Sequence, residues 1–377
     1  MKISFLYGQW CLSFRGTLDF QGLWQDPRGL SGSELGIIRT AEEMVRLGHD
    51  VHMYTISKDT EYHGIKIHPI AEADTAQTDV WISWNEPELL RGLKGFRVCE
   101  QMLNSFEYCK LGFDDHVDLW CSPSENHREM VLGMEHDHDL QIDGSPRGLY
   151  KANPDKWVTV RLGCDPERYV GRAEKVSGRV VYCSSPDRGL HWLLQEWHKI
   201  KSAVPHATLK IFYRLKPWLD TMHGMKYHHP PRPDLESLRS RAFYIEECLR
   251  RMPDKGIEVC DSVCREQIER EMSAAEVLAY PCDTIRYSEG FSCTILECCA
   301  ARACPVILDT DALGSIYRDA CVVVPRDDLS GWSDAVIRAL KDSEFRQGIN
   351  DRAEAFAKEL TWAARTKQLE QLLLSRL

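Results

Sequence analysis

Short apolar runs alternate with longer amphipathic stretches along this chain of 377 residues. The short runs are typical of strands buried in a parallel sheet, and the longer stretches have the spacing of helices. The first unit is a predicted strand at 2–6, a long loop, a predicted helix at 33–47 and a strand at 51–56. This succession is typical of a doubly wound sheet, so the pattern predicts an α/β fold.

The same alternation runs through the chain twice. Four more strands are predicted in the first half, at 80–83, 96–100, 119–122 and 157–160. A second series of strands is predicted at 179–182, 208–213, 257–260, 277–280, 306–308 and 321–324. Helices are predicted at 190–202, 234–252 and 265–274, and two more are expected to close the chain. The chain is too long for one ordinary core, so two α/β domains of similar size are expected.

Three segments interrupt the alternation. Residues 133–156 are polar and rich in His, Asp, Gly and Pro, which indicates a surface insertion. Residues 216–233 contain the run His228-His229-Pro230-Pro231, which predicts that this segment has no regular structure. The loop at 7–32 carries five glycines and is longer than most connections, and loops of this length are usually functional or mobile.

Composition narrows the class of protein. The formal net charge of −10 argues against nonspecific nucleic-acid binding, because that binding needs a positive field. No apolar run approaches the ~20 residues that span a bilayer, and the start of the chain is expected to be a strand rather than a signal peptide. The 15 cysteines are scattered, odd in number and without a C-x2-C pair. They indicate small buried side chains in a reducing compartment, so a cytoplasmic location is expected.

Candidate chemistry concentrates around Glu289 and Glu297, which have seven residues between them. An apolar run ending at Pro281 precedes them and an alanine- and cysteine-rich stretch follows, which predicts a strand, a turn and a helix. The backbone N–H groups at such a helix start form an anion site suited to a phosphate. A carboxylate on each side suits the sugar and the ribose of a nucleotide sugar. Taken alone, the pair is equally well explained as a solvated helix start, where glutamate offsets the helix dipole.

The surrounding residues favour the anion site. Glu289-Gly290-Phe291-Ser292, with the second glutamate at 297, resembles the E-x7-E motif of retaining glycosyltransferases with the GT-B fold, in particular glycosyltransferase family 4. Residues 300–307 resemble the family's helix-to-strand continuation, and residues 160–165 resemble the segment that closes its first domain. Ser184-Ser185-Pro186-Asp187-Arg188-Gly189 is similar to the second phosphate-binding segment of one subgroup. The likeness covers most of the chain.

The resemblance implies two Rossmann-like domains that face each other across a cleft. The N-terminal domain, residues 1–170 with a returning C-terminal helix at 361–377, is expected to bind the acceptor. The C-terminal domain, residues 171–360, is expected to bind the nucleotide sugar. The implied reaction is retaining, metal-independent transfer of a hexose-type sugar from a UDP- or GDP-sugar to a hydroxyl of a glycan or other acceptor.

The resemblance also assigns roles in the donor site. Glu289 and Arg188 are the candidate catalytic residues, with Glu289 on the sugar hydroxyls and Arg188 on the diphosphate. Arg188 suits phosphate because a guanidinium clamps two oxygens at once, whereas the dipole disfavours an unpaired arginine at a helix start. The other candidate donor-binding residues are Glu297, for the ribose, and Gly290, Phe291, Ser292, Cys293, Thr294, Ser185, Arg214 and Lys216.

Two departures from the family concern charge. Residues 183–185 stand where the family often has an arginine, so Arg188 is the one clear diphosphate ligand of that segment. Arg214 and Lys216, just after a predicted strand, are candidates for a second positive charge, and a solvated loop pair explains them about as well. Arg302 replaces a glycine that is usual in the family, and it is expected at a helix end, away from the donor.

In the N-terminal domain the candidate phosphate or acceptor loop is Gly32-Ser33-Glu34, at the start of the first long helix. Its N–H groups suit an anion, and Ser33 as a plain N-cap is compatible with that role. Gln101 and Asn104 are candidates for sugar or acceptor contacts, because the family places such groups after the fourth strand of this domain. Glu100 is interpreted either as a base or as a buried carboxylate in a structural pair.

No metal or other cofactor is expected. Asp309-Thr310-Asp311 follows a strand, as D-x-D motifs do in metal-dependent glycosyltransferases of another fold, but it comes too late in the chain. Turn chemistry is the better interpretation. The histidines at 136, 138, 228 and 229 are interpreted as solvated loop residues. Two alternatives to a glycosyltransferase stay open: a non-catalytic nucleotide-sugar-binding protein, and a GT-B epimerase or phosphorylase.

Overall fold

The computed structural model describes residues 1–8, 16–140, 147–225, 232–252 and 255–377. The chain divides into two compact units, Met1–Gly163 together with Leu360–Leu377, and Cys164–Glu359. The first division falls at Gly163 rather than after residue 170, because the segment that follows bonds to the second unit. Arg168, for example, donates hydrogen bonds of 2.6 and 3.1 Å to the two carboxylate oxygens of Glu269.

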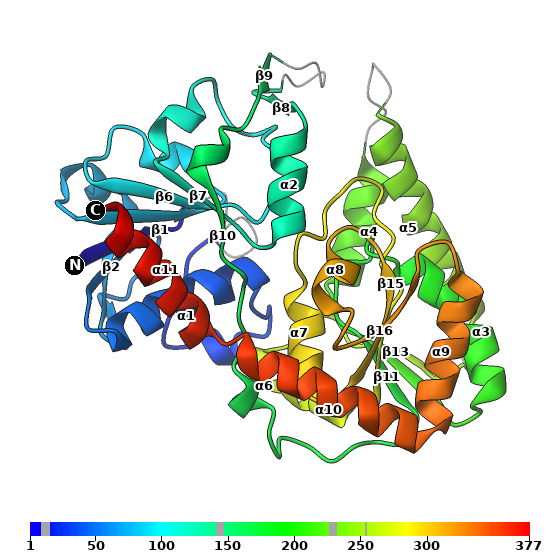
Figure 1. Cartoon of the computed structure of the whole chain (residues 1–377). Helices are drawn as coiled ribbons and strands as arrows, with labels where there is room; N and C mark the ends of the chain where they lie inside the picture. Colours follow the sequence, from blue (N-terminus) through cyan, green and yellow to red (C-terminus); the bar gives the residue numbers. More distant parts are fainter. Residues whose placement is uncertain (9–15, 141–146, 226–231, 253–254) are drawn as a thin grey trace. The chain divides into compact units, whose positions relative to one another are not determined.

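An eight-stranded sheet forms the centre of the first unit (Figure 1). Its strands, in spatial order, are β10 (Trp157–Thr159), β7 (Leu119–Ser122), β6 (Phe96–Glu100), β5 (Val80–Trp84), β1 (Lys2–Leu6), β2 (Asp50–Thr55), β4 (Ile65–Pro69) and β3 (Glu61–Tyr62). All neighbouring strands are parallel except β3 and β4, a short hairpin that the sequence pattern did not predict. The predicted α/β class is confirmed.

Helices and short turns surround this sheet. The helices are α1 (Gly32–Arg46), α2 (Glu125–Gly133) and α11 (Trp362–Arg376). The 3-10 turns are η1 (Leu23–Gln25), η2 (Ile70–Thr75), η3 (Pro87–Leu90), η4 (Phe113–His116) and η5 (Pro154–Lys156). The C-terminal helix α11 packs on α1. Its Arg365 donates to Thr40 Oγ1 at 2.8 Å and pairs with Glu100, which is fully buried, so Glu100 sits in a structural ion pair.

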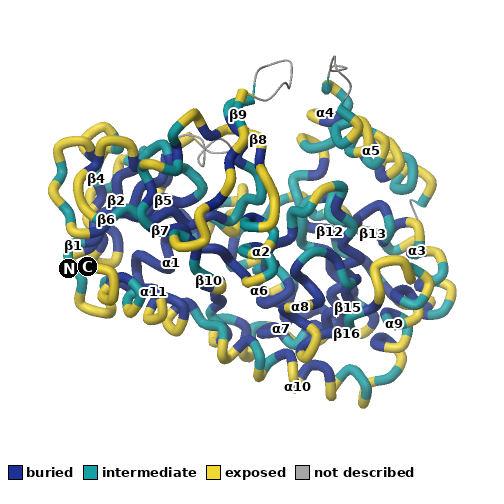
Figure 2. Tube along the Cα trace, turned by 45° about the horizontal axis from the view of Figure 1, so that its top comes forward, coloured by how far each residue is buried: buried dark blue, intermediate teal, exposed yellow. Residues whose placement is uncertain are grey.

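Aromatic rings fill the core of the first unit. The indoles of Trp120 and Trp157 are stacked with their centroids 5.1 Å apart, and Phe106 meets both edge-on. Trp120 Nε1 donates to Asp114 Oδ1 at 2.8 Å, so its one polar atom is satisfied. Figure 2 shows the strands of this unit as buried and its outer loops as exposed. The aromatic core therefore packs against the strands of the sheet, and Trp120 and Trp157 tie the neighbouring strands β7 and β10 together.

A small hairpin lies within the segment that was predicted as a surface insertion. Its strands are β8 (His136–His138) and β9 (Gly148–Tyr150). His136 and His138 are buried there, and His136 Nε2 lies 3.0 Å from the carbonyl oxygen of Val131. Their interpretation as solvated loop histidines is therefore wrong, because the hairpin folds back onto the aromatic core. His228 and His229 lie outside the described residues.

The second unit contains a six-stranded sheet in which every neighbouring pair is parallel. Its strands, in spatial order, are β13 (Ile257–Val259), β12 (Thr208–Ile211), β11 (Arg179–Tyr182), β14 (Val277–Tyr280), β15 (Cys304–Asp309) and β16 (Val322–Pro325). Counted within the unit, this is the 3-2-1-4-5-6 order of doubly wound nucleotide-binding sheets.

Helices cover both faces of this second sheet, with α3 and α9 on one side and α7 on the other (Figure 1). The helical elements are η6 (Pro166–Arg168), α3 (Leu190–Ala203), α4 (Leu215–Gly224), α5 (Pro233–Arg251), α6 (Arg265–Ala274), α7 (Cys293–Ala300), α8 (Leu313–Tyr317), α9 (Leu329–Lys341) and α10 (Ser343–Glu359). Helix α3 contacts α5 and α9, and α7 contacts α6 and α10.

Helix α4 corrects the prediction that residues 216–233 have no regular structure. Pro217 stands in its first turn, where the missing N–H has no intrahelical acceptor to lose. The C-terminal region also holds three helices, α9 to α11, instead of the two predicted. Arg302 lies at the end of α7 as expected, with a left-handed φ of +55°, and it pairs with Asp351 at 2.6 Å.

Among the described helices, none combines the length and the apolar character that crossing a membrane requires. Every cysteine in the described ranges is a free thiol, buried or half-buried. This agrees with the interpretation of the cysteines as small packing residues.

Candidate functional site

The strand order of the second unit marks one point on its sheet as a candidate binding site. Strands β11 and β14 are neighbours, but the chain continues from β11 toward β12 and from β14 toward β15. The two connections therefore run in opposite directions, and ligands of doubly wound sheets bind at the carboxyl ends of the strands at such a switch point. The segments that emerge there, 183–189 and 281–292, carry six of the eleven residues predicted for the donor site.

Gly189 allows these two segments to approach closely. Its φ is +98°, and a Cβ atom at this position would lie 1.8 Å from the carbonyl oxygen of Pro281. Glycine is therefore required both for the backbone conformation and for the contact. Thr294 Oγ1, at the start of α7, donates to the carbonyl oxygen of Cys183 at 2.9 Å. The segments after β11 and β14 thus form one connected structure.

Arg188 and Glu289, the two candidate catalytic residues, meet in this structure. Arg188 Nη1 lies 2.6 Å from Glu289 Oε1 and also bonds to the hydroxyl of Ser288. Burial raises the pKa of Glu289 to about 7, although the charge of Arg188 opposes the rise. Near neutral pH this carboxyl is therefore divided between a form that accepts hydrogen bonds only and a form that also donates one.

Asp311 holds the backbone of Glu289 in place. Its Oδ2 accepts hydrogen bonds from the N–H groups of Ser288 and Glu289 and from Thr284 Oγ1, each at 2.9 Å. Asp309, the other carboxylate of the D-x-D triplet, pairs with Arg318 at 3.0 Å. The two carboxylates serve separate contacts, as turn chemistry predicts. The positioning role of Asp311 was not identified from the sequence.

The predicted helix start after Glu289 is α7. Ser292 is its N-cap, with Oγ accepting from the N–H of Ile295 at 3.4 Å, and its carbonyl oxygen accepts from the Tyr317 hydroxyl at 2.7 Å. Residues 290–291 connect Glu289 to this cap, and Cys293 and Thr294 form the first turn. N–H groups in the first turn of a helix have no intrahelical acceptor, so this end of α7 is suited to an anion.

Glu297, the predicted ribose ligand, lies further along α7 and is buried. Its two oxygens accept from Arg265, the first residue of α6, with Nη2 to Oε1 at 2.5 Å and Nη1 to Oε2 at 3.2 Å. Burial raises the pKa of Glu297, and Arg265 opposes the rise. Arg265 was missed from the sequence, although it carries the signal that singled out Arg188, an arginine at a predicted helix start.

The remaining predicted donor residues lie around this centre or away from it. The hydroxyl of Ser185 bonds to the carboxylate of Asp187, next to Arg188. Lys216 is 81% exposed and pairs with Asp220 at 2.8 Å, which is the solvated environment weighed as the alternative for it. Arg214 is the residue that precedes α4.

In the first unit, the predicted loop Gly32-Ser33-Glu34 is the first turn of α1. The N-cap is Ser31 rather than Ser33, because Ser31 and Glu34 form a reciprocal capping box: Ser31 Oγ accepts from the N–H of Glu34 at 3.2 Å, and Glu34 Oε2 accepts from the N–H of Ser31 at 2.8 Å. The Ser33 hydroxyl is therefore not needed as the cap.

Asn85 connects this helix start to Met102, the residue that follows the predicted site residue Gln101. It follows β5 with a left-handed φ of +58°, its Oδ1 accepts from the N–H of Met102 at 2.7 Å, and its Nδ2 lies 3.5 Å from Ser33 Oγ. Gln101 Nε2 donates to the carbonyl oxygen of Leu103 at 2.9 Å, one residue before Asn104. An asparagine after a strand was the sequence signal for this residue, and it was missed.

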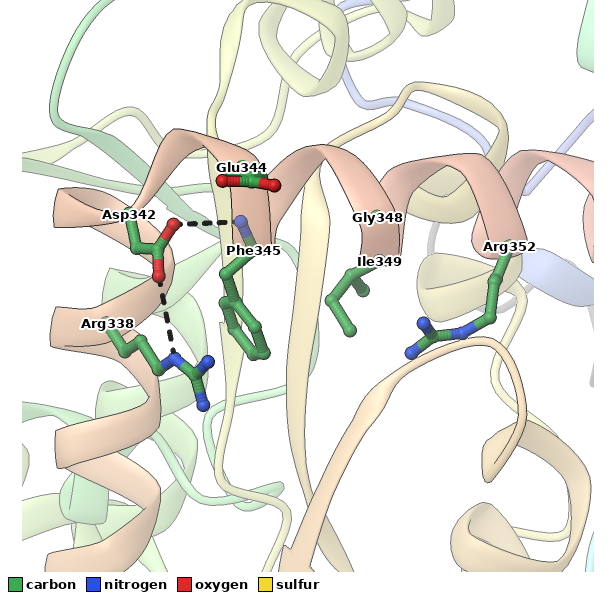
Figure 3. A pocket seen from close by; sticks show the side chains of 7 residues that line it. All are labelled: Arg338, Asp342, Glu344, Phe345, Gly348, Ile349 and Arg352. Atoms are coloured by element: carbon green, nitrogen blue, oxygen red, sulfur yellow. Dashed lines mark hydrogen bonds and ion pairs between the residues drawn. The ribbon is translucent and has the colours of Figure 1, made fainter.

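No cluster of three or more His, Cys, Asp or Glu side chains in the described ranges is arranged to hold a metal ion. A hollow of ≈ 420 Å³ lies on the second unit (Figure 3). It is lined by Arg338, Asp342, Glu344, Phe345, Gly348, Ile349 and Arg352. These residues come from α9, α10 and their connection, and none is a predicted site residue. The guanidinium of Arg338 lies 3.9 Å from the centre of the Phe345 ring, so two of the lining side chains pack against each other.

Comparison with known proteins adds one finding. No protein-family model and no curated protein matches this sequence, but solved structures match nearly its whole length. Sucrose-phosphate synthase from Thermosynechococcus elongatus has a TM-score of 0.65 at 13% identity, covering 99% of this chain and 98% of that one. HepE of Anabaena, solved with UDP and glucose, has a TM-score of 0.64 at 13% identity, covering 100% of both chains. The chain has the GT-B fold. A glycosyltransferase from Rickettsia africae shares this GT-B architecture, with a TM-score of 0.66 at 10% identity over 99% of this chain and 97% of that one.

Proposed function

We propose that this protein is a retaining glycosyltransferase that binds a UDP- or GDP-sugar in its second unit. The observation that carries the proposal is the pairing of Arg188 with Glu289 beside the start of α7, at the switch point between β11 and β14. A diphosphate requires cationic and N–H donors, and a sugar requires hydroxyl acceptors. This point of the sheet offers both within one short stretch of structure.

Arg188 is the proposed diphosphate ligand. Its charge is matched by Glu289 in the structure, and we propose that the diphosphate takes over as its partner. A hydrogen bond to a charged group is worth roughly 1.5–3 kcal/mol. Glu289, released from the arginine, then accepts hydrogen bonds from sugar hydroxyls, and Glu297 accepts them from the ribose. As the bond to the diphosphate breaks, Arg188 and the first-turn N–H groups of α7 stabilise the growing negative charge, and no divalent ion is required.

The proposed transfer keeps the configuration at the anomeric carbon. A bond forms from the acceptor oxygen to that carbon while the bond to the diphosphate oxygen breaks. The acceptor proton passes to a diphosphate oxygen on the same face of the sugar. The first unit is proposed to hold the acceptor through residues 32–34 together with Gln101 and Asn104, and Asn85 bonds to Ser33 of the first segment and to Met102 between the other two residues.

The structural likeness supports a nucleotide sugar as the ligand. HepE of Anabaena has been solved with UDP and glucose and with UDP-glucose. UDP-glucose is therefore the first donor to test. A glycan or other hydroxyl-bearing acceptor is proposed on the same grounds, since the other matched structures include sucrose-phosphate synthase.

One observation favours a second candidate, a protein that binds a nucleotide sugar without transferring it. Arg188 is paired with Glu289, and the exposed Lys216 is paired with Asp220, so these two predicted cations would have to exchange a carboxylate partner for the diphosphate. Donor hydrolysis or transfer distinguishes the two candidates, because a binding protein shows neither.

A thermal-shift panel of UDP- and GDP-sugars tests the proposal, since a ligand at 100 times its Kd stabilises the folded protein by about 2.7 kcal/mol. The true donor is expected to stand out from the panel. Transfer or hydrolysis of that donor is then measured for wild type, Glu289→Gln and Arg188→Ala. We expect Glu289→Gln to fold and to lose activity. Unchanged transfer in both variants would show that the site is assigned wrongly.

A further inference from the structure

A buried ion network lies beneath the proposed ribose ligand, and the proposed reaction leaves it without a role. Arg265 is its central member and is 8% exposed. Besides its two bonds to Glu297, Arg265 donates from Nε to Glu269 Oε1 at 3.0 Å and from Nη2 to the Tyr169 hydroxyl at 2.7 Å. Each nitrogen of the guanidinium is therefore fixed by a named acceptor.

The network is anchored to the segment that opens the second unit. Arg168 donates to both oxygens of Glu269, at 2.6 and 3.1 Å, and Arg172 Nη2 lies 3.1 Å from Glu269 Oε2. Glu269 has no exposed surface. Three guanidinium groups thus share this carboxylate, and Arg265 is the one that reaches from it to Glu297. A buried carboxylate held in this way is a rigid support.

Lone-pair geometry indicates what this support is for. An ionised carboxylate offers about four acceptor sites, two on each oxygen. Arg265 occupies one site on each oxygen of Glu297, because its two terminal nitrogens bond to different oxygens. One site on each oxygen remains, and a ribose presents two neighbouring hydroxyls. The number and the pairing of the remaining acceptors fit that diol.

We propose that Arg265 is a positioning residue of the nucleotide-sugar site, which holds the Glu297 carboxylate ionised and in one orientation for the two ribose hydroxyls. The inference rests on the proposed function and extends it to a residue that does not touch the donor. It also identifies a buried positive charge beside α7, on the ribose side of the proposed site, that the sequence had not indicated.

Charge is as important here as orientation. Burial raises the pKa of Glu297, with Asp165 and Glu269 adding to the rise, and Arg265 is the charge that opposes it. A protonated carboxyl would donate one hydrogen bond and lose acceptor capacity. Replacing Arg265 with a neutral side chain therefore weakens ribose recognition in two ways, through orientation and through protonation.

The test compares binding of ligands with and without the ribose diol. UDP and 2′,3′-dideoxy-UDP, or the guanine pair if GDP is the nucleotide that stabilises the protein, are titrated calorimetrically into wild type, Arg265→Met and Arg265→Lys. Arg346→Met serves as the matched control, because Arg346 also pairs with a glutamate of the second unit, Glu276, at 2.8 Å.

We expect wild type and Arg346→Met to prefer the ribonucleotide by about 100-fold or more, because the dideoxy ligand loses two hydrogen bonds to a charged group, each worth roughly 10- to 100-fold. Arg265→Met is expected to lose most of this preference while binding the dideoxy ligand as wild type does. Arg265→Lys keeps the charge but not the two-pronged geometry, so an intermediate preference is expected. A purely structural role would weaken both ligands alike and leave the preference unchanged.

Three outcomes would overturn the inference. The first is that Arg265→Met prefers the ribonucleotide over the dideoxy ligand as strongly as wild type does. If the methionine variant does not fold, the same result in Arg265→Lys counts instead. The second is equal weakening of both ligands. The third is absence of nucleotide binding by wild type, which would refute the proposed function as well. A wild type that discriminates, together with a methionine variant that still does, would refute the role of Arg265 alone.

Discussion

The buried carboxyl of Glu289 should give this protein a pH-dependent stability that one substitution removes. Its pKa is about 7 in the folded chain, against an ordinary value of 4.5. Between these two pH values the folded state binds more protons than the unfolded state, so the free energy of unfolding falls as pH rises. Each unit between the two pKa values is worth about 1.4 kcal/mol, so the rise from 4.5 to about 7 changes the free energy of unfolding by about 3 kcal/mol in total. The stabilisation is complete below pH 4.5 and is lost above pH 7.

Glu289→Gln tests this reasoning because the amide has the same shape and does not titrate. Urea unfolding of the ligand-free protein is followed by circular dichroism at several pH values between 4.5 and 8. Wild type should lose about 3 kcal/mol more than the variant over this range, with no further divergence above pH 7. Glu236→Gln, an exposed change on α5, is the control and should follow wild type. Parallel curves for wild type and Glu289→Gln would refute the reasoning.

Three further predictions concern other parts of the molecule. Gly189→Ala places a Cβ atom on a left-handed backbone and against the carbonyl oxygen of Pro281, so it should lower the free energy of unfolding by at least about 2 kcal/mol. The control is Gly348→Ala, whose Cβ atom would meet nothing within 4 Å, and it should be neutral or slightly stabilising in the same urea titration. Arg365→Met leaves Glu100 buried without its partner and should lower the free energy of unfolding by about 3–5 kcal/mol. The control Lys66→Met removes one side of an exposed pair and should lower it by less than about 1 kcal/mol. Equal losses in the two variants would contradict the prediction. Donor turnover should be unchanged in EDTA, and activity that returns only with added Mg²⁺ would refute metal independence.

Much of the fold could be predicted because buried strands and amphipathic helices have different spacings of apolar residues. The predicted strands at Phe96–Glu100 and Leu119–Ser122 are confirmed to the residue. The pattern failed where local signals conflict with tertiary packing. Prolines near α4 suggested irregular structure, although Pro217 stands where a helix tolerates it.

The residues of the candidate site likewise fall into those that local sequence could indicate and those that only tertiary packing reveals. Arg188, Glu289 and the α7 start belong to short local segments, so the resemblance of those segments to a known family could indicate them. Asp311 and Arg265 act on partners 22 and 32 positions away along the chain, and only the packing of α6 and β15 beside α7 brings them there. A single sequence carries no signal for such pairings beyond the residue types themselves.

The central claim is that Arg188 binds the diphosphate of a nucleotide sugar. Calorimetric titration of the donor found in the thermal-shift panel into wild type, Arg188→Ala and Arg346→Ala tests it most directly, because both variants remove an arginine that is paired with a glutamate. The account predicts binding by wild type and Arg346→Ala, and affinity about 10- to 100-fold lower for Arg188→Ala. Equal affinity for wild type and Arg188→Ala would contradict it.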